Sequence, residues 1–212
     1  MTMLDPFYPV VPDSGWVARL VPAGARLIQL RIKDQPPAEI RRQVKEAKAA
    51  CATGGAQLIV NDYWQAAIDE GCDYVHLGQE DLVDADVKAL RRAGIRIGVS
   101  THDHAELDKG LAVDPDYVAL GPIYPTLLKQ MPFAPQGTAR LAEWKRLIGD
   151  RPLVAIGGLT LERALLCLAS GADIASVVGD IVNNADPIAQ TKAWVAATRA
   201  KTMGAKTVGA KS

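Results

Sequence analysis

Short apolar runs alternate along the chain with stretches of helix-favouring residues. Several runs are almost continuously apolar, which is typical of strands buried on both faces of a parallel sheet. The runs that predict strands are residues 8–11, 27–30, 57–60, 74–76, 95–99, 117–120, 153–156 and 174–178. Three stretches rich in Ala, Leu, Arg and Glu predict helices at 36–52, 83–93 and 161–170.

Glycines mark the points where helices are expected to end. Gly24, Gly55, Gly71, Gly94 and Gly171 each lie one to three residues before a predicted strand. A residue that ends a helix often adopts a left-handed conformation, which glycine reaches at little cost. The repeated order of helix, glycine and strand predicts a single-domain (β/α)8 TIM barrel, with an open doubly wound sheet as the alternative.

Two segments depart from this repeat. Residues 121–137 contain four prolines and no helical period, so we expect a long loop after the sixth strand, on the catalytic face of a barrel. Residues 201–212 read KTMGAKTVGAKS and contain few large apolar side chains. We expect this tail to be disordered and the barrel domain to span 1–200.

Composition narrows the choice of partners. The 212 residues carry 24 basic and 24 acidic side chains, so no global basic field favours nucleic acid or an anionic membrane. Cys51, Cys72 and Cys167 show no pairing pattern, and no segment resembles a secretory signal or a membrane span. We therefore expect a cytoplasmic protein that binds small molecules, with homo-oligomerisation left open.

Charged side chains follow two of the predicted strands. Gln29, Arg31 and Lys33 are spaced by two, so they would share one face of an extended strand and could bind a phosphate or pyrophosphate. Asp62 and Asp81 follow neighbouring strands and could share Mg2+. Each aspartate also precedes a helical stretch, so helix capping is an equally good interpretation.

Other strand ends offer hydroxyl, imidazole and glycine groups. Ser100 could cap a helix or donate to a phosphate, and His76 could be a neutral donor, a base or a packed core residue. Gly158 and Gly179 follow the last two strands, where a barrel of this kind commonly cradles a phosphate. With Lys129 from the long loop, these residues favour transfer between phosphorylated partners, with pyrophosphate as a leaving group.

The blocks QLRIKD, LIVNDYWQAAIDEGCDYVHLGQEDL, GVSTHDHAE, ALGPIYPTLLKQMPFAPQG and VAIGGL resemble the thiamine-phosphate synthase family. This resemblance extends from about Tyr8 to Ile181. It implies a (β/α)8 barrel that joins hydroxymethylpyrimidine diphosphate to thiazole phosphate. Thiamine phosphate and pyrophosphate would form with Mg2+, through a dissociative, pyrimidine-cation-like step.

The resemblance also implies roles for individual residues. Arg31, Ser100 and Lys129 would act in catalysis by contacting the pyrophosphate, and Asp62 and Asp81 would bind Mg2+. The implied substrate-binding residues are Tyr8, Gln29, Arg31, Lys33, Asn61, His76, Ser100, Thr126, Lys129, Gly158 and Gly179.

The sequence departs from the family pattern at Leu128 in the long loop and at Gly179. Leu127 and Leu128 occupy a loop that typically reads Pro-Thr-x-Thr-Lys, so one anion-binding hydroxyl is replaced by an apolar side chain and we expect weaker binding or slower turnover. Gly179 stands where the family commonly has Ser. A thiazole tautomerase-like enzyme and a catalytically silent binder of thiamine precursors are the alternatives.

Overall fold

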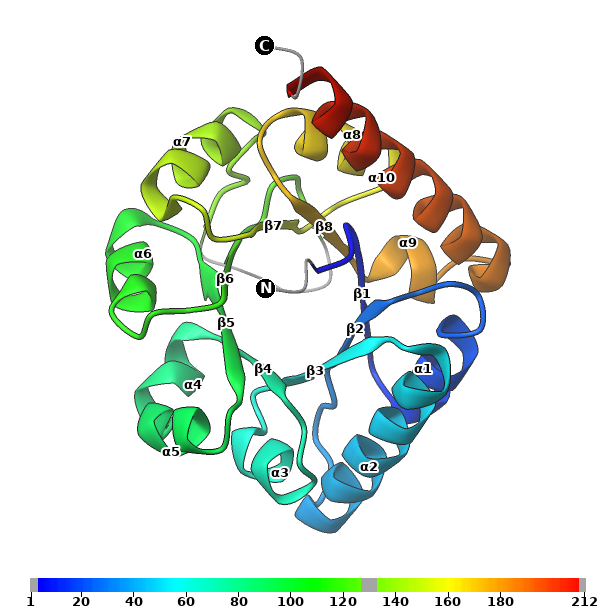
Figure 1. Cartoon of the computed structure of the whole chain (residues 1–212), viewed down its shortest axis with the longest axis vertical. Coiled ribbons are helices and arrows are strands. Elements are labelled where there is room, and N and C mark those ends of the chain that lie inside the picture. Colours follow the sequence, from blue (N-terminus) through cyan, green and yellow to red (C-terminus); the bar gives the residue numbers. More distant parts are fainter. Residues whose placement is uncertain (1–3, 127–132, 210–212) are drawn as a thin grey trace.

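Within the described residues, parallel strands form a closed barrel surrounded by helices (Figure 1). The computed structural model describes residues 4–126 and 133–209. Each strand pairs with the next, and the last pairs with the first, which confirms the barrel and excludes the open sheet. The strands are β1 (Phe7–Val11), β2 (Leu27–Leu30), β3 (Gln57–Asn61), β4 (Tyr74–Leu77), β5 (Arg96–Thr101), β6 (Tyr117–Leu120), β7 (Leu153–Ile156) and β8 (Ile174–Val177).

Helices α1 to α8 occupy the connections between successive strands, as a parallel sheet requires, and α9 and α10 follow β8. They are α1 (Ser14–Leu20), α2 (Pro37–Gly54), α3 (Trp64–Asp69), α4 (Gln79–Asp84), α5 (Val87–Arg92), α6 (His104–Leu111), α7 (Ala139–Ile148), α8 (Leu161–Ala169), α9 (Gly179–Val182) and α10 (Pro187–Gly209). Gly55 ends α2 and Gly94 follows α5, both at positive φ, so the predicted glycine signal is confirmed at these turns.

The helix predicted at 83–93 is wrong in its extent. The structure has two short helices there, α4 and α5, separated by Ala85 and Asp86. Ala85 is extended, and the Asp86 carboxylate accepts a hydrogen bond from the backbone amide of Ala89 at 2.8 Å. This side-chain cap starts a new helix inside a stretch whose composition predicts one continuous helix.

The sequence predicts a disordered tail over 201–212, whereas α10 in the structure continues to Gly209. The first part of α10 is docked on the barrel: Trp194 is fully buried, and Arg199 pairs with Asp5 at 2.8 Å. Extending an existing helix avoids the cost of nucleation, which allows α10 to continue through a segment that contains Gly204 and Gly209 as well as helix-favouring Ala and Lys. The helix therefore crosses the domain limit expected at residue 200, and residues 210–212 lie outside the described residues.

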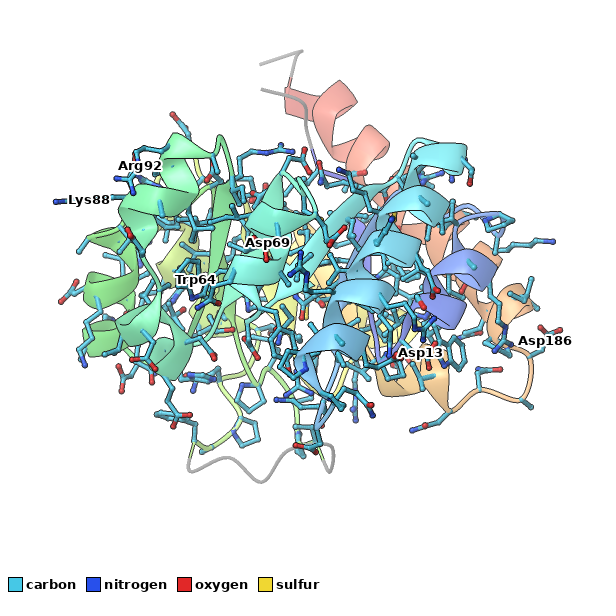
Figure 2. All side chains as sticks on the ribbon, turned by 90° about the horizontal axis from the view of Figure 1, so that it is seen from below. Asp13, Trp64, Asp69, Lys88, Arg92 and Asp186 are labelled. Atoms are coloured by element: carbon cyan, nitrogen blue, oxygen red, sulfur yellow. The ribbon has the colours of Figure 1, made fainter. Side chains whose placement is uncertain are left out.

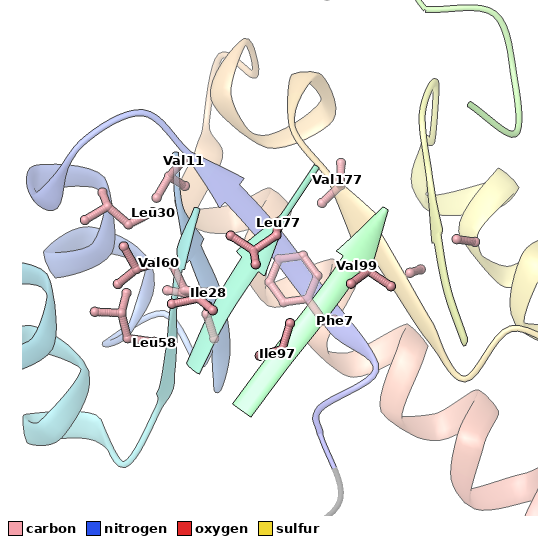
Figure 3. Packing of buried hydrophobic residues seen from close by; sticks show 14 of the residues in the cluster. Phe7, Val11, Ile28, Leu30, Leu58, Val60, Leu77, Ile97, Val99 and Val177 are labelled. Atoms are coloured by element: carbon pink, nitrogen blue, oxygen red, sulfur yellow. The ribbon is translucent and has the colours of Figure 1, made fainter. Parts of the chain in front are cut away.

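An outer apolar layer joins the strands to the helices. Alternate strand residues, such as Ile28, Val60 and Val99, point away from the barrel axis and are buried against the helices. Figure 3 shows part of this layer. Because the intervening residues must point inward, each strand is buried on both faces, which explains the nearly continuous apolar runs in the sequence.

An inner layer fills the barrel itself. It contains Tyr8, Leu27, Ile59, Tyr74, Tyr117, Ala119, Val154 and Ile174, with Leu4 packed against it. Gly98 lies beside Tyr117 in the sheet, and a Cβ atom at Gly98 would overlap the tyrosine ring. These side chains therefore fill the barrel interior as a packed layer.

The two ends of the barrel carry different side chains. At the strand starts, aspartates are fixed in ion pairs, such as Asp116 with Arg91 at 2.7 Å and Asp173 with Lys145 at 2.8 Å. A cavity of about 140 Å3 at this end lies between α2, the start of β3 and the two residues that precede β4, Cys72 and Asp73. In Figure 2, Asp13, which follows β1, lies lower than Asp69 at the end of α3, so the strands end toward the lower side. The candidate site lies at that lower end.

Candidate functional site

Two carboxylates meet where β3 and β4 end. Asp62 directly follows β3 in a left-handed conformation (φ +63°), and Asp81 lies in the first turn of α4. Burial, then the charge and hydrogen bonding of Asp81, raises the pKa of Asp62 to about 6. Nearby Lys33 and Arg31 act in the opposite direction. The predicted acidic pair and the predicted cations are therefore close together.

The helix-capping interpretations are wrong for these residues. The cap position of α3 is Tyr63, with no side-chain cap bond, and Asp81 lies inside α4. Ser100 does not cap the following helix α6 either, because Asp103 does so by accepting from the amide of Glu106 at 2.8 Å. The side chains of Asp62, Asp81 and Ser100 are therefore not the N-terminal caps of α3, α4 and α6.

Only one of the three predicted residues Gln29, Arg31 and Lys33 lies within β2. Gln29 faces inward, as Leu27 does in the same strand, and is 4% exposed. Arg31 and Lys33 lie beyond the last strand residue, where Arg31 is half-buried and Lys33 exposed. Both lie near enough to Asp62 to oppose the rise of its pKa. Arg31 and Lys33 therefore place two cations at the mouth of the barrel, beyond the buried Gln29.

A chain of hydrogen bonds crosses the interior of the barrel. The Nε2 of Gln29 donates to the hydroxyl of Tyr8 at 2.8 Å, and this hydroxyl lies 2.9 Å from that of Tyr117. The Tyr117 hydroxyl lies 2.7 Å from Nδ1 of His76, and Nε2 of His76 lies 2.8 Å from Oγ of Ser100. We call these five residues, which come from five different strands, the relay.

His76 is held as a neutral imidazole. Burial lowers its pKa to about 4, and Arg31 adds to this effect while Asp81 opposes it. Its ring stacks on that of Tyr117 with an interplanar angle of 12°. Of the interpretations left open by the sequence, a packed histidine with both nitrogens partnered agrees with the structure, and so does a neutral hydrogen-bonding group.

Asn61 is buried with an unused donor. It is the last residue of β3, lies beside His76 in the sheet, and is 4% exposed. Its Nδ2 has no hydrogen-bond partner among the described residues. A buried amide without a partner costs free energy, so it is an informative position for a ligand contact.

The turn after β7 packs tightly against the loop after β6. Gly158 has φ +65°, and a Cβ atom there would lie 2.8 Å from the carbonyl oxygen of Tyr124 and overlap that of Pro125. Arg163 donates to the carbonyl of Gly158 at 2.7 Å, and its guanidinium lies over the ring of Tyr124. The loops after β6 and β7 therefore pack directly against each other at the mouth of the barrel.

The structure gives fewer contacts for the predicted residues of the long loop and of the turn after β8. Thr126 is half-buried at the end of the described part of the long loop, and Gly179 begins α9 after β8. Lys129, Leu127 and Leu128 lie outside the described residues. The described parts of 121–137 contain no helix or strand, as expected.

Sequence reasoning missed three residues of the site. Tyr117 begins an apolar run and gave no signal apart from its aromatic ring, although it bonds to both Tyr8 and His76. Gln79 donates to the carbonyl of Ser100 at 2.7 Å. Ser176 faces the barrel beside Tyr8, and its Oγ has no partner among the described residues.

The predicted magnesium ligands are the carboxylates of Asp62 and Asp81. Among the described residues, no group of three or more His, Cys, Asp or Glu side chains forms a metal cluster. A Cβ atom at Gly78 would lie 2.9 Å from the Asp81 carboxylate, so this glycine leaves room beside the pair. Two carboxylates suit Mg2+, which commonly keeps waters and substrate phosphates as its other ligands.

The sequence comparisons with known proteins agree on one family. A family model described as thiamine monophosphate synthase matches residues 10–181. A protein from Rhizobium etli named thiamine-phosphate synthase is 60% identical over 195 residues, which cover 92% of this chain and 96% of the relative. A relative of the same name from Neisseria meningitidis serogroup B is 46% identical over 190 residues, covering 90% and 93%.

The fold comparison gives the same architecture. The solved structure of thiamine phosphate pyrophosphorylase from Pyrococcus furiosus superposes with a TM-score of 0.82 at 23% identity, covering 93% of this chain and 96% of that one. At this identity the likeness supports the barrel fold alone. Across the residues that the structure describes, we find no helix with the length and apolar character needed to cross a membrane.

Proposed function

The chain belongs to the thiamine monophosphate synthase family, and from this premise we propose how its barrel mouth works. Its activity is that of a thiamine-phosphate synthase, which is a transferase. We propose that it joins hydroxymethylpyrimidine diphosphate to thiazole phosphate, with Mg2+ as the cofactor and release of pyrophosphate. The family assignment favours this reaction over that of a tautomerase or a silent binder.

The observation that carries this proposal is the charge arrangement beside β3 and β4. A carboxylate pair that repels itself lies next to two cations, Arg31 and Lys33. Such a pair is stabilised by a divalent ion, and the cations are suited to a diphosphate that shares that ion. Asp62 and Asp81 would hold Mg2+, which supplies neutralisation of the diphosphate charge when it is bound.

The protein side chains would favour departure of the pyrophosphate. Arg31, Lys33 and Ser100 can donate to its oxygens as the bond to the pyrimidine carbon breaks, which places positive charge and hydrogen-bond donors where negative charge develops. Lys129 would add a further cation from the long loop. Asn61 and Gln29, with Tyr8 and His76 beneath them, would orient the pyrimidine ring, and the unused Nδ2 of Asn61 supports this role.

The other substrate would bind on the opposite side of the mouth. Gly158 and Gly179 follow β7 and β8, the usual phosphate position in this fold, and Thr126 comes from the adjoining loop. We propose that they hold the thiazole phosphate, so that its ring nitrogen faces the cation-like pyrimidine carbon. A cytoplasmic location is part of the proposal, and the three free, buried cysteines are consistent with it.

A two-product assay tests this function. The purified protein is mixed with both substrates and Mg2+, and thiamine phosphate and pyrophosphate are measured together. We expect equal amounts of the two products and none after addition of EDTA. Binding of either precursor without product would support a silent binder, and isomerisation of a thiazole substrate without pyrophosphate would support a tautomerase.

A further inference from the structure

The relay of Gln29, Tyr8, Tyr117, His76 and Ser100 has a direction. Its first link is an amide N–H, which can only donate, so the Tyr8 oxygen accepts from Gln29. Tyr8 is 1% exposed, and the partner available to its own proton is the Tyr117 oxygen at 2.9 Å. If Tyr117 donated to Tyr8 instead, the Tyr8 proton would be buried without an acceptor, which is costly.

This direction continues through the imidazole. Because the Tyr117 oxygen accepts from Tyr8, its proton is available to Nδ1 of His76 at 2.7 Å. A neutral imidazole that accepts at Nδ1 carries its proton on Nε2. That proton points to Oγ of Ser100 at 2.8 Å.

The last residue of the relay is left with a free proton. Ser100 accepts from His76, so its own O–H does not have to satisfy a buried partner. Its backbone is fixed from the other side, because Gln79 donates to its carbonyl oxygen at 2.7 Å. Ser100 is half-buried, so its hydroxyl can reach a ligand at the mouth.

We propose that Tyr117 is a positioning residue, which fixes His76 as the Nε2–H tautomer and thereby leaves the Ser100 hydroxyl to donate to an anion. In the opposite direction, Ser100 would donate to His76 and present only lone pairs to the anion, which would repel it. The inference rests on the proposed function for the identity of that anion, pyrophosphate. The direction of the relay itself does not depend on the substrate.

The tautomer can be measured in the unmodified protein. The chain has three histidines, so a long-range 1H–15N spectrum of 15N-labelled protein contains few imidazole signals. Loss of one set in His76→Asn assigns His76. We expect Nε2 to be protonated and Nδ1 to be unprotonated at pH 7. A proton on Nδ1 would overturn the inference.

The positioning role is tested by binding of inorganic pyrophosphate with Mg2+, followed by calorimetry. Ser100→Ala should weaken binding about tenfold or more, because a hydrogen bond to a charged group is lost. Tyr117→Phe should weaken it about three- to tenfold, because His76 can then adopt either tautomer. Tyr74→Phe is the matched control: its ring lies 5.6 Å from that of Tyr117, but it does not belong to the relay.

The outcomes separate this inference from the proposed function. Equal binding by Tyr117→Phe and the unmodified protein, with Ser100→Ala weakened, would overturn the positioning role and leave the function intact. Absence of pyrophosphate binding by the unmodified protein would count against the function, while the tautomer would still decide the direction of the relay. In Gln29→Glu, an ionised carboxylate can only accept, so a supporting result is a shift of the His76 proton toward Nδ1.

Discussion

At the scale of single residues, the half-buried acidic pair of Asp62 and Asp81 lowers the stability of the folded protein, and a bound cation would offset this loss. The pKa of Asp62 is raised to about 6, first by burial and then by Asp81. At neutral pH its ionised form is therefore less favourable in the folded protein than in the unfolded chain. Such a pair is retained at the expense of stability, which is common for groups with a functional role.

Replacing Asp81 tests this cost. In EDTA, Asp81→Asn should raise the free energy of unfolding by about 1 kcal/mol and Tm by about 2–4 °C, because the repulsion of Asp62 is removed. The same variant should lose most synthase activity. Thermal unfolding and the two-product assay measure the two effects. Asp84→Asn, on the exposed side of the same helix, should change neither, and a lower Tm for Asp81→Asn would contradict the argument.

His76 gives a prediction about acid stability. Its pKa in the folded protein is lowered to about 4, against 6.5 for an unperturbed histidine. The unfolded chain therefore binds more protons between pH 6.5 and 4, and the free energy of unfolding falls as the pH is lowered through this range. Between pH 7 and pH 5, protonation of His76 in the unfolded chain should lower the free energy of unfolding by about 2 kcal/mol.

Urea unfolding at pH 7 and pH 5 measures this loss. Between pH 7 and pH 5, the free energy of unfolding of His76→Asn should fall by about 2 kcal/mol less than that of the unmodified protein. This difference is expected even if the variant is less stable at both pH values. His102→Asn is the matched control, because His102 lies beside Glu106 and not in the relay. The same pH dependence in His76→Asn and in the unmodified protein would be inconsistent with a neutral His76.

At the scale of elements, the loops after β6 and β7 act as one unit. Gly158 permits their close approach, and Arg163 from α8 joins them through the Gly158 carbonyl and the Tyr124 ring. A side chain at Gly158 would separate the loops. The effect should be on binding of the thiazole phosphate, which we place at this turn.

The prediction is that Gly158→Ala raises the KM for thiazole phosphate about tenfold or more, with a smaller change in the KM for the pyrimidine substrate. Gly94→Ala is the matched control, because Gly94 also has positive φ (+73°) but a Cβ atom there would meet nothing within 4 Å. It should cost about 1 kcal/mol of stability for the left-handed backbone and leave both KM values unchanged. Steady-state kinetics with each substrate varied in turn distinguish the two.

At the scale of the whole molecule, the proposed catalytic groups lie at one end of the barrel, and ion pairs that stabilise the fold lie at the other. The relay crosses the barrel interior and ends at Ser100. The acidic pair lies where β3 and β4 end, and fixed ion pairs lie at the strand starts. Asp116 accepts from the amide of Ile97 at 2.8 Å and pairs with Arg91. Its loss would leave a strand amide without this partner at the end opposite the proposed site.

Asp116→Ala should therefore lower the free energy of unfolding by about 1–3 kcal/mol, because the Ile97 amide and the Arg91 charge both lose a partner. The kcat of the folded enzyme should not change. Asp69→Ala removes an exposed pair with Arg41 at 3.5 Å and should have almost no effect on stability. A large fall in kcat for Asp116→Ala at a temperature where it is folded would argue against this separation.

The sequence by itself determined the order of strands and helices, the barrel, and most residues at the strand ends. It could do so because burial on both faces makes each strand apolar, and because helices end at glycines such as Gly55 and Gly94. It also located Asp62, Asp81, Arg31 and Lys33, since parallel strands bring their ends to one face.

Only the tertiary structure decided what these residues do to one another. The pKa of Asp62 depends on its distance from Asp81 and its burial, and neither can be obtained from their spacing in the chain. Tyr117 became part of the site because Gly98, on the neighbouring strand, leaves room for its ring. The break between α4 and α5 depended on one side-chain cap, and the length of α10 on a helix already docked on the barrel. These effects arise from contacts between residues distant in sequence or from local competition that average propensities do not resolve.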